Sequence, residues 1–194
     1  MTIVRVNPQS VHAYGADANT KFDGIRAELV QLVNAVTEVR FFGPNAVDFK
    51  TRSGQLAADF ANSLNRDLGA VAAAVSASTT AIAQSLGGVP LKLEVNPAPI
   101  TPPAVASVDY VDVDTAALDS LKTNVNRHFA AIGSLLDGHM TQLQNTDWAG
   151  NAKEQAVGSV TSFTSSAKAK CDEAQQSLNT YISSQVTATV AADR

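Results

Sequence analysis

An aromatic residue followed two positions later by glycine occurs twice in this chain, each time between two long heptad patterns. The two occurrences are Phe41-Phe42-Gly43 and Trp148-Ala149-Gly150, and they lie 107 residues apart (148 − 41). The same offset aligns apolar residues that precede each signature, several of them identical: Phe22 with Phe129, Ile25 with Ile132 and Leu29 with Leu136. Identities that also bring the two glycines into coincidence predict two copies of one helical hairpin.

The composition favours helices and argues against several functions. The chain has 194 residues, enough for one sizeable domain or two small ones. Its hydrophobic content of 45% is mostly Ala, Val and Leu, with 6% aromatics, which favours helices with narrow apolar seams. The net charge of −4 and the lack of a basic cluster argue against nucleic-acid binding, because no group of basic side chains is present to neutralise phosphates. The single cysteine, Cys171, excludes an internal disulfide and is expected to be a small buried apolar residue.

Two helices are predicted in the first half of the chain. Asn7 followed by Pro8 is typical of a helix start, and apolar residues then recur every three or four positions until Arg40. The second helix begins at Pro44 or Asn45 and ends at Gly87-Gly88, a doubled stop signal. Its apolar seam is predicted to run through Ala46, Phe49, Leu56, Phe60, Leu64, Leu68, Val71, Val75 and Ile82.

The second half repeats this pattern after a change of composition. Residues 89–111 contain five prolines and are predicted to be an extended linker, although the alternating segment Leu91–Val95 is also compatible with a short strand. A third helix follows a cap at Asp112 or Asp114, and a fourth runs from about Asn151 to Ala191. The predicted organisation is a first hairpin over 1–88, a linker over 89–111 and a second hairpin over 112–194.

The linker length indicates how the hairpins pack. A helix of about 32 residues is roughly 48 Å long, and an extended linker of this length spans roughly 75 Å. Parallel hairpins would need only a short connection between them. We therefore expect an all-α protein in which two antiparallel helical hairpins form an intramolecular four-helix bundle with a long Pro-rich crossover.

No catalytic or metal-binding pattern stands out. His12, His128 and His139 lack a ligand spacing and are expected to be surface or partly buried residues. Asp109 and the two aspartates that follow it lack the glycine and bidentate glutamate of a calcium loop. There is no phosphate-binding loop and no nucleophile with an evident base. The sequence therefore predicts a protein that is not an enzyme and that has no cofactor and no metal site.

Two features bear on membranes and export. Leu68–Leu86 is the most apolar stretch, but its hydroxyl and amide side chains favour a helix packed in a bundle over a membrane-inserting toxin. The segment Met1–Val6 lacks the apolar core of a secretory signal, so any export is expected to follow a route that does not read one.

The two aromatic-x-Gly segments are the candidate functional residues. Gly43 and Gly150 are expected to adopt positive φ angles in tight turns between long helices. Phe41, Phe42 and Trp148 can either plug the ends of the hairpins or anchor a partner, and these two uses are compatible.

At these positions the chain resembles the Trp-x-Gly (WXG) helical-hairpin family of type VII (ESX) secretion. Trp148-Ala149-Gly150 fits the signature literally, and residues 41–46 with Phe49 are similar to the variant Trp-x-Gly-Pro-Asp-Ala-x-x-Phe with phenylalanine in place of tryptophan. Members of that family are hairpins about half this long that pair antiparallel into four-helix bundles. The resemblance covers nearly the whole chain, each half matching one unit, and it implies a tandem fusion.

The resemblance also implies an export signal and a set of partners. The family signal, Tyr-x-x-x-Asp/Glu after the second helix, has a degenerate counterpart in Tyr181 and Gln185, where glutamine replaces the acid. The implied function is a secreted substrate or a partner-binding component of type VII secretion. Its partners would be the secretion machinery or a co-secreted effector, with membrane contact not expected. The protein would be secreted without a signal peptide, or cytoplasmic before export, and monomeric because its hairpins pair within one chain. A cytosolic adaptor or chaperone for an effector is the alternative, ahead of a membrane-inserting helical toxin.

Overall fold

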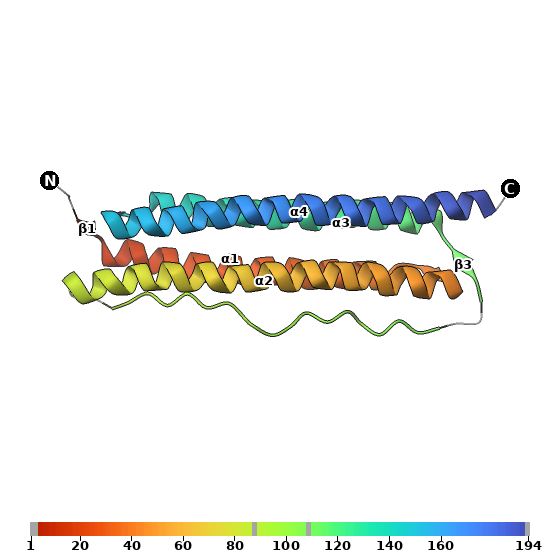
Figure 1. Ribbon diagram of the computed structural model, residues 1–194, viewed down its shortest axis with the longest axis horizontal. Coiled ribbons are helices and arrows are strands. Elements are labelled where there is room, and N and C mark those ends of the chain that lie inside the picture. The colour runs from red at the N-terminus through yellow and green to blue at the C-terminus, as the bar shows by residue number, and fades with distance from the viewer. Residues whose placement is uncertain (1–3, 87–88, 108–109, 193–194) are drawn as a thin grey trace. The chain divides into compact units, whose positions relative to one another are not determined.

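The computed structural model of the chain describes residues 4–86, 89–107 and 110–192, and long helices dominate them (Figure 1). The helices are α1 (Pro8–Glu38), α2 (Pro44–Leu86), α3 (Thr115–Asn145) and α4 (Asn151–Ala192). The predicted fold class is confirmed: two antiparallel hairpins, α1–α2 and α3–α4, form a four-helix bundle with a long Pro-rich crossover. Two predicted features, the Gly87-Gly88 stop and Asp109, lie outside the described residues.

The first helix of each hairpin begins at a capping side chain. The Oδ1 atom of Asn7 accepts hydrogen bonds from the backbone N–H groups of Gln9 and Ser10, at 3.1 and 3.3 Å. Asp114 Oδ1 accepts from Ala116 and Ala117 in the same way, at 2.9 and 3.2 Å. These bonds satisfy N–H groups that have no partner inside the helix. Of the two predicted caps for α3, Asp114 is therefore the one that is used.

Four short strands flank the helices and repeat at the offset of 107. They are β1 (Arg5–Val6), β2 (Phe41–Phe42), β3 (Asp112–Val113) and β4 (Trp148–Ala149). Adding 107 to the bounds of β1, α1 and β2 gives the bounds of β3, α3 and β4. Strand β1 pairs antiparallel with β4, and β2 pairs antiparallel with β3. Each two-residue sheet therefore joins a segment of one half to a segment of the other.

The chain forms two compact units, and neither coincides with a hairpin. The first unit comprises Met1–Ile25, Leu64–Ala98 and Gly133–Lys168; the second comprises Arg26–Ser63, Pro99–Ile132 and Ala169–Arg194. Within the described residues, each unit contains a segment of all four helices. Each unit therefore has a core of its own, to which both halves of the sequence contribute.

The core of the first unit is built from the predicted heptad positions. Its fully buried side chains include Tyr14, Phe22, Ile25, Leu64, Leu68, Leu136 and Leu143. The core of the second unit includes Leu29, Leu32, Phe49, Leu118, Ile132, Leu178 and Ile182, and Cys171 is buried in it as predicted. One seam position was wrong: Leu56 is 39% exposed, whereas its neighbours Ser53 and Ala57 are fully buried. The buried face of α2 is therefore turned slightly away from the predicted seam at this point.

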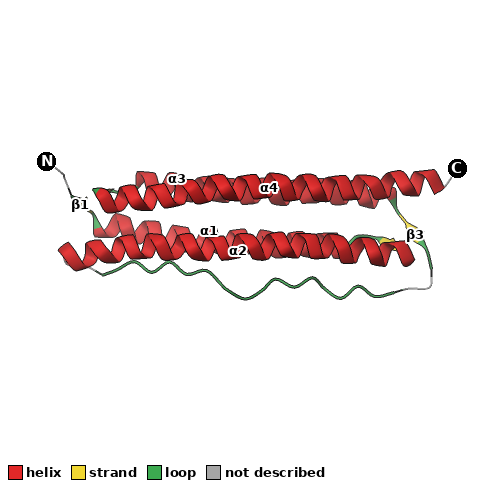
Figure 2. Ribbon diagram, in the orientation of Figure 1, coloured by secondary structure: helices red, strands yellow, loops and turns green. Residues whose placement is uncertain are grey.

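The described part of the linker is extended, and Leu91–Val95 is not a strand (Figure 2). In the first unit Leu91 and Leu93 are nevertheless buried, because they pack onto the α1–α2 hairpin. Gly15 makes room for Leu91, since a Cβ atom at Gly15 would lie 2.1 Å from Leu91 Cδ1. The backbone N–H of Leu93 donates to the hydroxyl of Ser76 at 2.9 Å. The alternating pattern thus reflects one buried face and not a sheet.

In the second unit the linker is held by side chains of α2. The amide of Asn62 donates to the carbonyl of Ile100 at 2.9 Å and accepts from its N–H at 2.8 Å. Gly54 leaves space for Pro102, whose Cβ would lie 3.3 Å from a Cβ at that glycine. These bonds replace the strand partners that the linker lacks, so its backbone polar groups are partly satisfied by side chains.

The expectation of surface or partly buried histidines was wrong for two of the three. In the first unit His139 is fully buried, and its Nε2 lies 2.8 Å from the hydroxyl oxygen of Tyr14. In the second unit His128 is 2% exposed, and its Nδ1 lies 2.6 Å from Glu28 Oε2. His12 is exposed. Polar side chains from α1 thus make burial of both α3 histidines tolerable.

No helix among residues 4–86, 89–107 and 110–192 has the length and apolarity needed to cross a membrane, Leu68–Leu86 included. No group of three or more His, Cys, Asp or Glu side chains in the same residues is arranged to hold a metal ion.

Candidate functional site

The two aromatic-x-Gly segments, which we call the hinges (Phe41–Gly43 and Trp148–Gly150), form the same turn. Gly43 has a φ angle of 118° and Gly150 one of 117°, so glycine is needed at both positions. The carbonyl of Gly43 accepts from the N–H groups of Ala46 and Val47 at 3.0 and 3.2 Å. The carbonyl of Gly150 accepts from the N–H groups three and four residues later at the same distances. The predicted positive φ angles are therefore present.

The hinge of the first unit pairs with the segment that leads into α1. Val6 lies opposite Trp148 and Arg5 opposite Ala149 in the β1–β4 sheet. The N–H of Asn7 adds a bond to the carbonyl of Asp147 at 2.9 Å. Trp148 is only 3% exposed, and its indole Nε1 has no hydrogen-bond partner among the described residues. Trp148 therefore closes the core of this unit and does not present an anchor to solvent.

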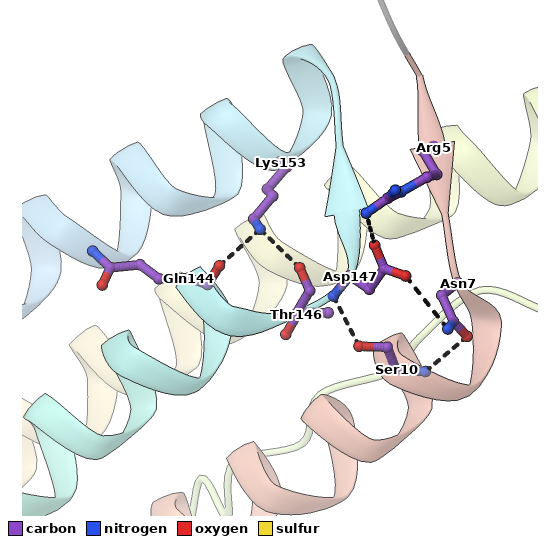
Figure 3. A network of polar contacts seen from close by, with 7 residues as sticks. All are labelled: Arg5, Asn7, Ser10, Gln144, Thr146, Asp147 and Lys153. Atoms are coloured by element: carbon purple, nitrogen blue, oxygen red, sulfur yellow. Dashed lines mark hydrogen bonds and ion pairs between the residues drawn. The ribbon is translucent and has the colours of Figure 1, made fainter.

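Asp147, directly before this hinge, is the centre of a polar network (Figure 3). Its carboxylate accepts hydrogen bonds from the guanidinium of Arg5 and, at 3.5 Å, from the amide of Asn7. Its backbone N–H donates to the hydroxyl of Ser10 at 2.9 Å. On the other side of the hinge, the ammonium of Lys153 donates to the carbonyls of Gln144 and Thr146 at 2.8 Å each. A cation at these carbonyls stabilises the end of α3.

The hinge of the second unit is more open. Phe41 is 4% exposed and packs edge-on against Phe49, with ring centroids 5.6 Å apart. Phe42 is half-buried beside the exposed ring of Tyr110, at 5.5 Å, and the ammonium of Lys50 lies 4.8 Å from its ring centroid. Burial lowers the pKa of Lys50. Among the three predicted aromatics, Phe42 is therefore the one that remains accessible.

Tyr181 and Gln185 lie close to this second hinge. The ring of Tyr181 stacks on Phe49, with centroids 5.2 Å apart, and burial, followed by the charge of Asp48, raises the pKa of its hydroxyl. Gln185 is half-buried and lines a hollow of about 200 Å³ together with Phe41, Phe42, Val111 and Val113. The structure thus brings Tyr181 and Gln185 together with the hinge Phe41–Gly43.

An equivalent hollow lies beside the hinge of the first unit. It has a volume of about 300 Å³, and its lining includes Val6, Trp148, Ile82 and Leu86. The two hollows correspond at the offset of 107. Val6 in the first hollow is equivalent to Val113 in the second, and Trp148 in the first is equivalent to Phe41 in the second. Their linings otherwise differ: Ile82 and Leu86 line the first hollow together with His12 and Thr79, whereas Gln185 places an amide in the second.

The structure separates the predicted site residues by exposure. Phe41, Gly43 and Trp148 are buried, whereas Gly150 is partly exposed in the first unit and Phe42, Tyr181 and Gln185 are partly exposed in the second. Sequence reasoning missed the strands β1 and β3, which close both hinges. The offset of 107 could have indicated them, because residues 5–6 and 112–113 occupy equivalent positions directly before the two helix caps.

No family model matches this chain, and no curated protein or solved structure matches it either.

Proposed function

We propose that this chain is a non-enzymatic protein of type VII (ESX) secretion, a secreted substrate or partner-binding component that resembles a fused WXG dimer. The observation that carries the proposal is the pair of equivalent hinges. Each has a glycine with positive φ after an aromatic-x step, and each is closed by a strand from the opposite half. Trp148-Ala149-Gly150 has the signature of that family, and Phe41-Phe42-Gly43 resembles it with phenylalanine in place of tryptophan. Both lie between two long helices, as the signature does in that family.

The covalent linker supplies what separate hairpins achieve by dimerisation. Joining two modules converts their association into an intramolecular event with a high effective concentration. The side-chain bonds to the linker, such as those of Asn62 with Ile100, keep the connection ordered. We therefore expect a monomer whose partner is the secretion machinery or a co-secreted effector, and not nucleic acid.

The surface best suited to that partner is the second hinge. Phe42 and its neighbour Tyr110 present aromatic area, and Val111 beside them is 72% exposed. Aromatic side chains that are only partly buried in the free protein are typical anchors of an interface. Gln185 lies at the same place, so a partner docking there would contact the degenerate signal as well.

A cytosolic adaptor or chaperone is the second candidate, and one observation favours it. Tyr181 is stacked on Phe49 instead of standing free, and Gln185 has no charge at any pH. A signal in this state would be recognised poorly. The membrane-inserting toxin has no such support, since no described helix is apolar enough to span a bilayer.

Export from the native host tests the proposal with four chains: wild type, Gln185→Glu, Tyr181→Phe and Tyr181→Ala. If this helix carries the signal, Gln185→Glu should raise the level in the medium, and both tyrosine variants should lower it. Tyr181→Phe is the sharper variant, because it removes the hydroxyl but keeps a ring that can stack on Phe49. A cytosolic marker controls for lysis, and circular dichroism of each variant controls for misfolding.

Equal export of all four chains would show that Tyr181 and Gln185 carry no signal. Complete retention of Gln185→Glu in the cell, in a host with an active type VII system, would instead favour the adaptor.

A further inference from the structure

The residues beside each hinge sheet carry opposite charges in the two halves of the chain. Arg5, in the strand before α1, corresponds at the offset of 107 to Asp112, in the strand before α3. Arg40, just before the hinge Phe41–Gly43, corresponds to Asp147, just before the hinge Trp148–Gly150. The first half therefore has arginine at both positions, and the second half has aspartate at both.

These four residues form one ion pair in each unit. In the first unit the guanidinium of Arg5 contacts the carboxylate of Asp147. In the second unit Nε and Nη2 of Arg40 lie 3.2 and 3.0 Å from Asp112 Oδ2. Both sheets have the same register, with Val6 opposite Trp148 and Val113 opposite Phe41. The pairs are therefore equivalent in position and reversed in polarity.

This reversal matters because the two halves have equivalent strands, first helices and hinges, so the backbone pairing of the sheets does not itself distinguish the other half from a second copy of the same half. Two copies of the first half in the observed register would place Arg5 beside Arg40 at both sheets. Two copies of the second half would place Asp112 beside Asp147. Only a first half with a second half brings opposite charges together at both sheets.

We propose that Arg5, Arg40, Asp112 and Asp147 form a pairing code that makes the two halves complementary to each other and incompatible with copies of themselves. Specificity of this kind needs a repulsive element against the wrong partner as well as an attraction to the right one. Arg5 lies opposite Ala149 and Asp112 opposite Phe42, so each charged pair is a diagonal contact at the edge of its sheet. Like charges at these neighbouring positions supply that repulsion. The code selects a hairpin with acidic residues at these two positions as the partner of the first half.

The exposure of the pairs determines how the code acts. The side chains of Arg5 and Asp147 are 71% and 40% exposed, and those of Arg40 and Asp112 are 67% and 36% exposed. A single pair of this kind contributes little. The discrimination arises from the sum over two sheets, where a wrong pairing loses two attractions and gains two repulsions. Its strength should fall at 1 M salt, where the Debye length is about 3 Å.

A charge-reversal cycle in the full chain tests the pair of the first unit. Arg5→Asp and Asp147→Arg should each lower the folding equilibrium constant on the order of tenfold in low salt, since each replaces an attraction by a repulsion. The two substitutions together should recover most of the loss, and 1 M NaCl should shrink both effects. Arg52→Asp is the matched control, because Arg52 forms an exposed pair with Asp48 (69% and 58% exposed) within α2 and not between halves. An additive cycle without recovery would overturn the proposal.

A mixing experiment tests the code itself. One chain carries Arg5→Asp with Arg40→Asp, and the other carries Asp112→Arg with Asp147→Arg, so every hinge pair within each chain is a like-charge pair. Unfolded together and refolded in low salt, the two chains should form a 1:1 dimer by exchanging halves, since all four pairs are then restored. Native mass spectrometry detects this dimer even if neither chain folds alone. A mixture that contains only monomers as stable as the wild type would show that these charges do not select the partner.

Discussion

Acidification is expected to weaken the fold at one identifiable contact, the buried pair of Tyr14 and His139. The hydroxyl of Tyr14 lies 2.8 Å from His139 Nε2, and the ring of Phe22 packs edge-on against the imidazole at 4.9 Å. The other ring nitrogen, Nδ1, has no hydrogen-bond partner among the described residues. An imidazolium here would be desolvated and poorly paired, because Nδ1–H would have nothing to donate to.

The size of the effect follows from the pKa of His139. Burial lowers this pKa from 6.5 to about 4. The positive charge of Lys21 adds to the lowering, and the negative charge of Asp17 opposes it to a smaller extent. The unfolded chain takes up a proton below about 6.5, whereas the folded chain resists it until about 4. The contribution of neutral His139 to the free energy of unfolding is therefore fully present above pH 6.5 and is lost as the pH falls towards 4. At about 1.36 kcal/mol per pH unit, the loss at pH 4 is about 3 kcal/mol.

The double variant Tyr14→Phe/His139→Leu isolates this contribution from other titrating groups. It removes both polar partners together, so no buried hydroxyl is left unpaired. Leucine is also the residue at position 32, which corresponds to His139 at the offset of 107. Urea unfolding at pH 7.5 and at pH 4.5 should show the wild type losing about 2 to 3 kcal/mol more than the variant. Two results would refute this account. One is a difference in the free energy of unfolding between wild type and variant that is the same at both pH values, and the other is an NMR titration midpoint of His139 near 6.5 in the folded protein.

Replacing either hinge glycine by alanine should lower the free energy of unfolding by about 1 to 3 kcal/mol, because Gly43 and Gly150 have φ angles of 118° and 117°. The control, Gly158→Ala, has nothing within 4 Å of the new Cβ in mid-helix and should gain about 0.5 to 1 kcal/mol in the same urea titration. A loss at Gly158 equal to that at the hinges would contradict the role of the turn. Gly15→Ala should cost about 1 to 3 kcal/mol because its Cβ would overlap Leu91. That cost should largely disappear in a Leu91→Ala background, and a cost independent of Leu91 would mean that the linker does not pack there.

The helices could be predicted closely because their signals are local. Asn7 with Pro8 and the hinge glycines specify ends through single-residue chemistry, and the observed starts at Pro8 and Pro44 match the predicted ones. The buried face follows from heptad spacing, which fails only where the helix turns slightly, as at Leu56. The burial of His128 and His139 could not be predicted, because it depends on Glu28 and Tyr14 from another helix.

The placement of the linker and the closure of the hinges could not be predicted, because both depend on contacts between residues far apart in the chain. Strands of two residues have no periodicity to detect, and the bonds of Asn62 to Ile100 join residues that no local pattern connects. The offset of 107 nevertheless contains the missing information. A repeat predicts which residues occupy equivalent places, and a charge that reverses between equivalent places, as from Arg5 to Asp112, indicates that each half meets the other and not itself. In a repeated chain, the positions where the copies differ in charge are therefore as informative about pairing as the positions where they agree.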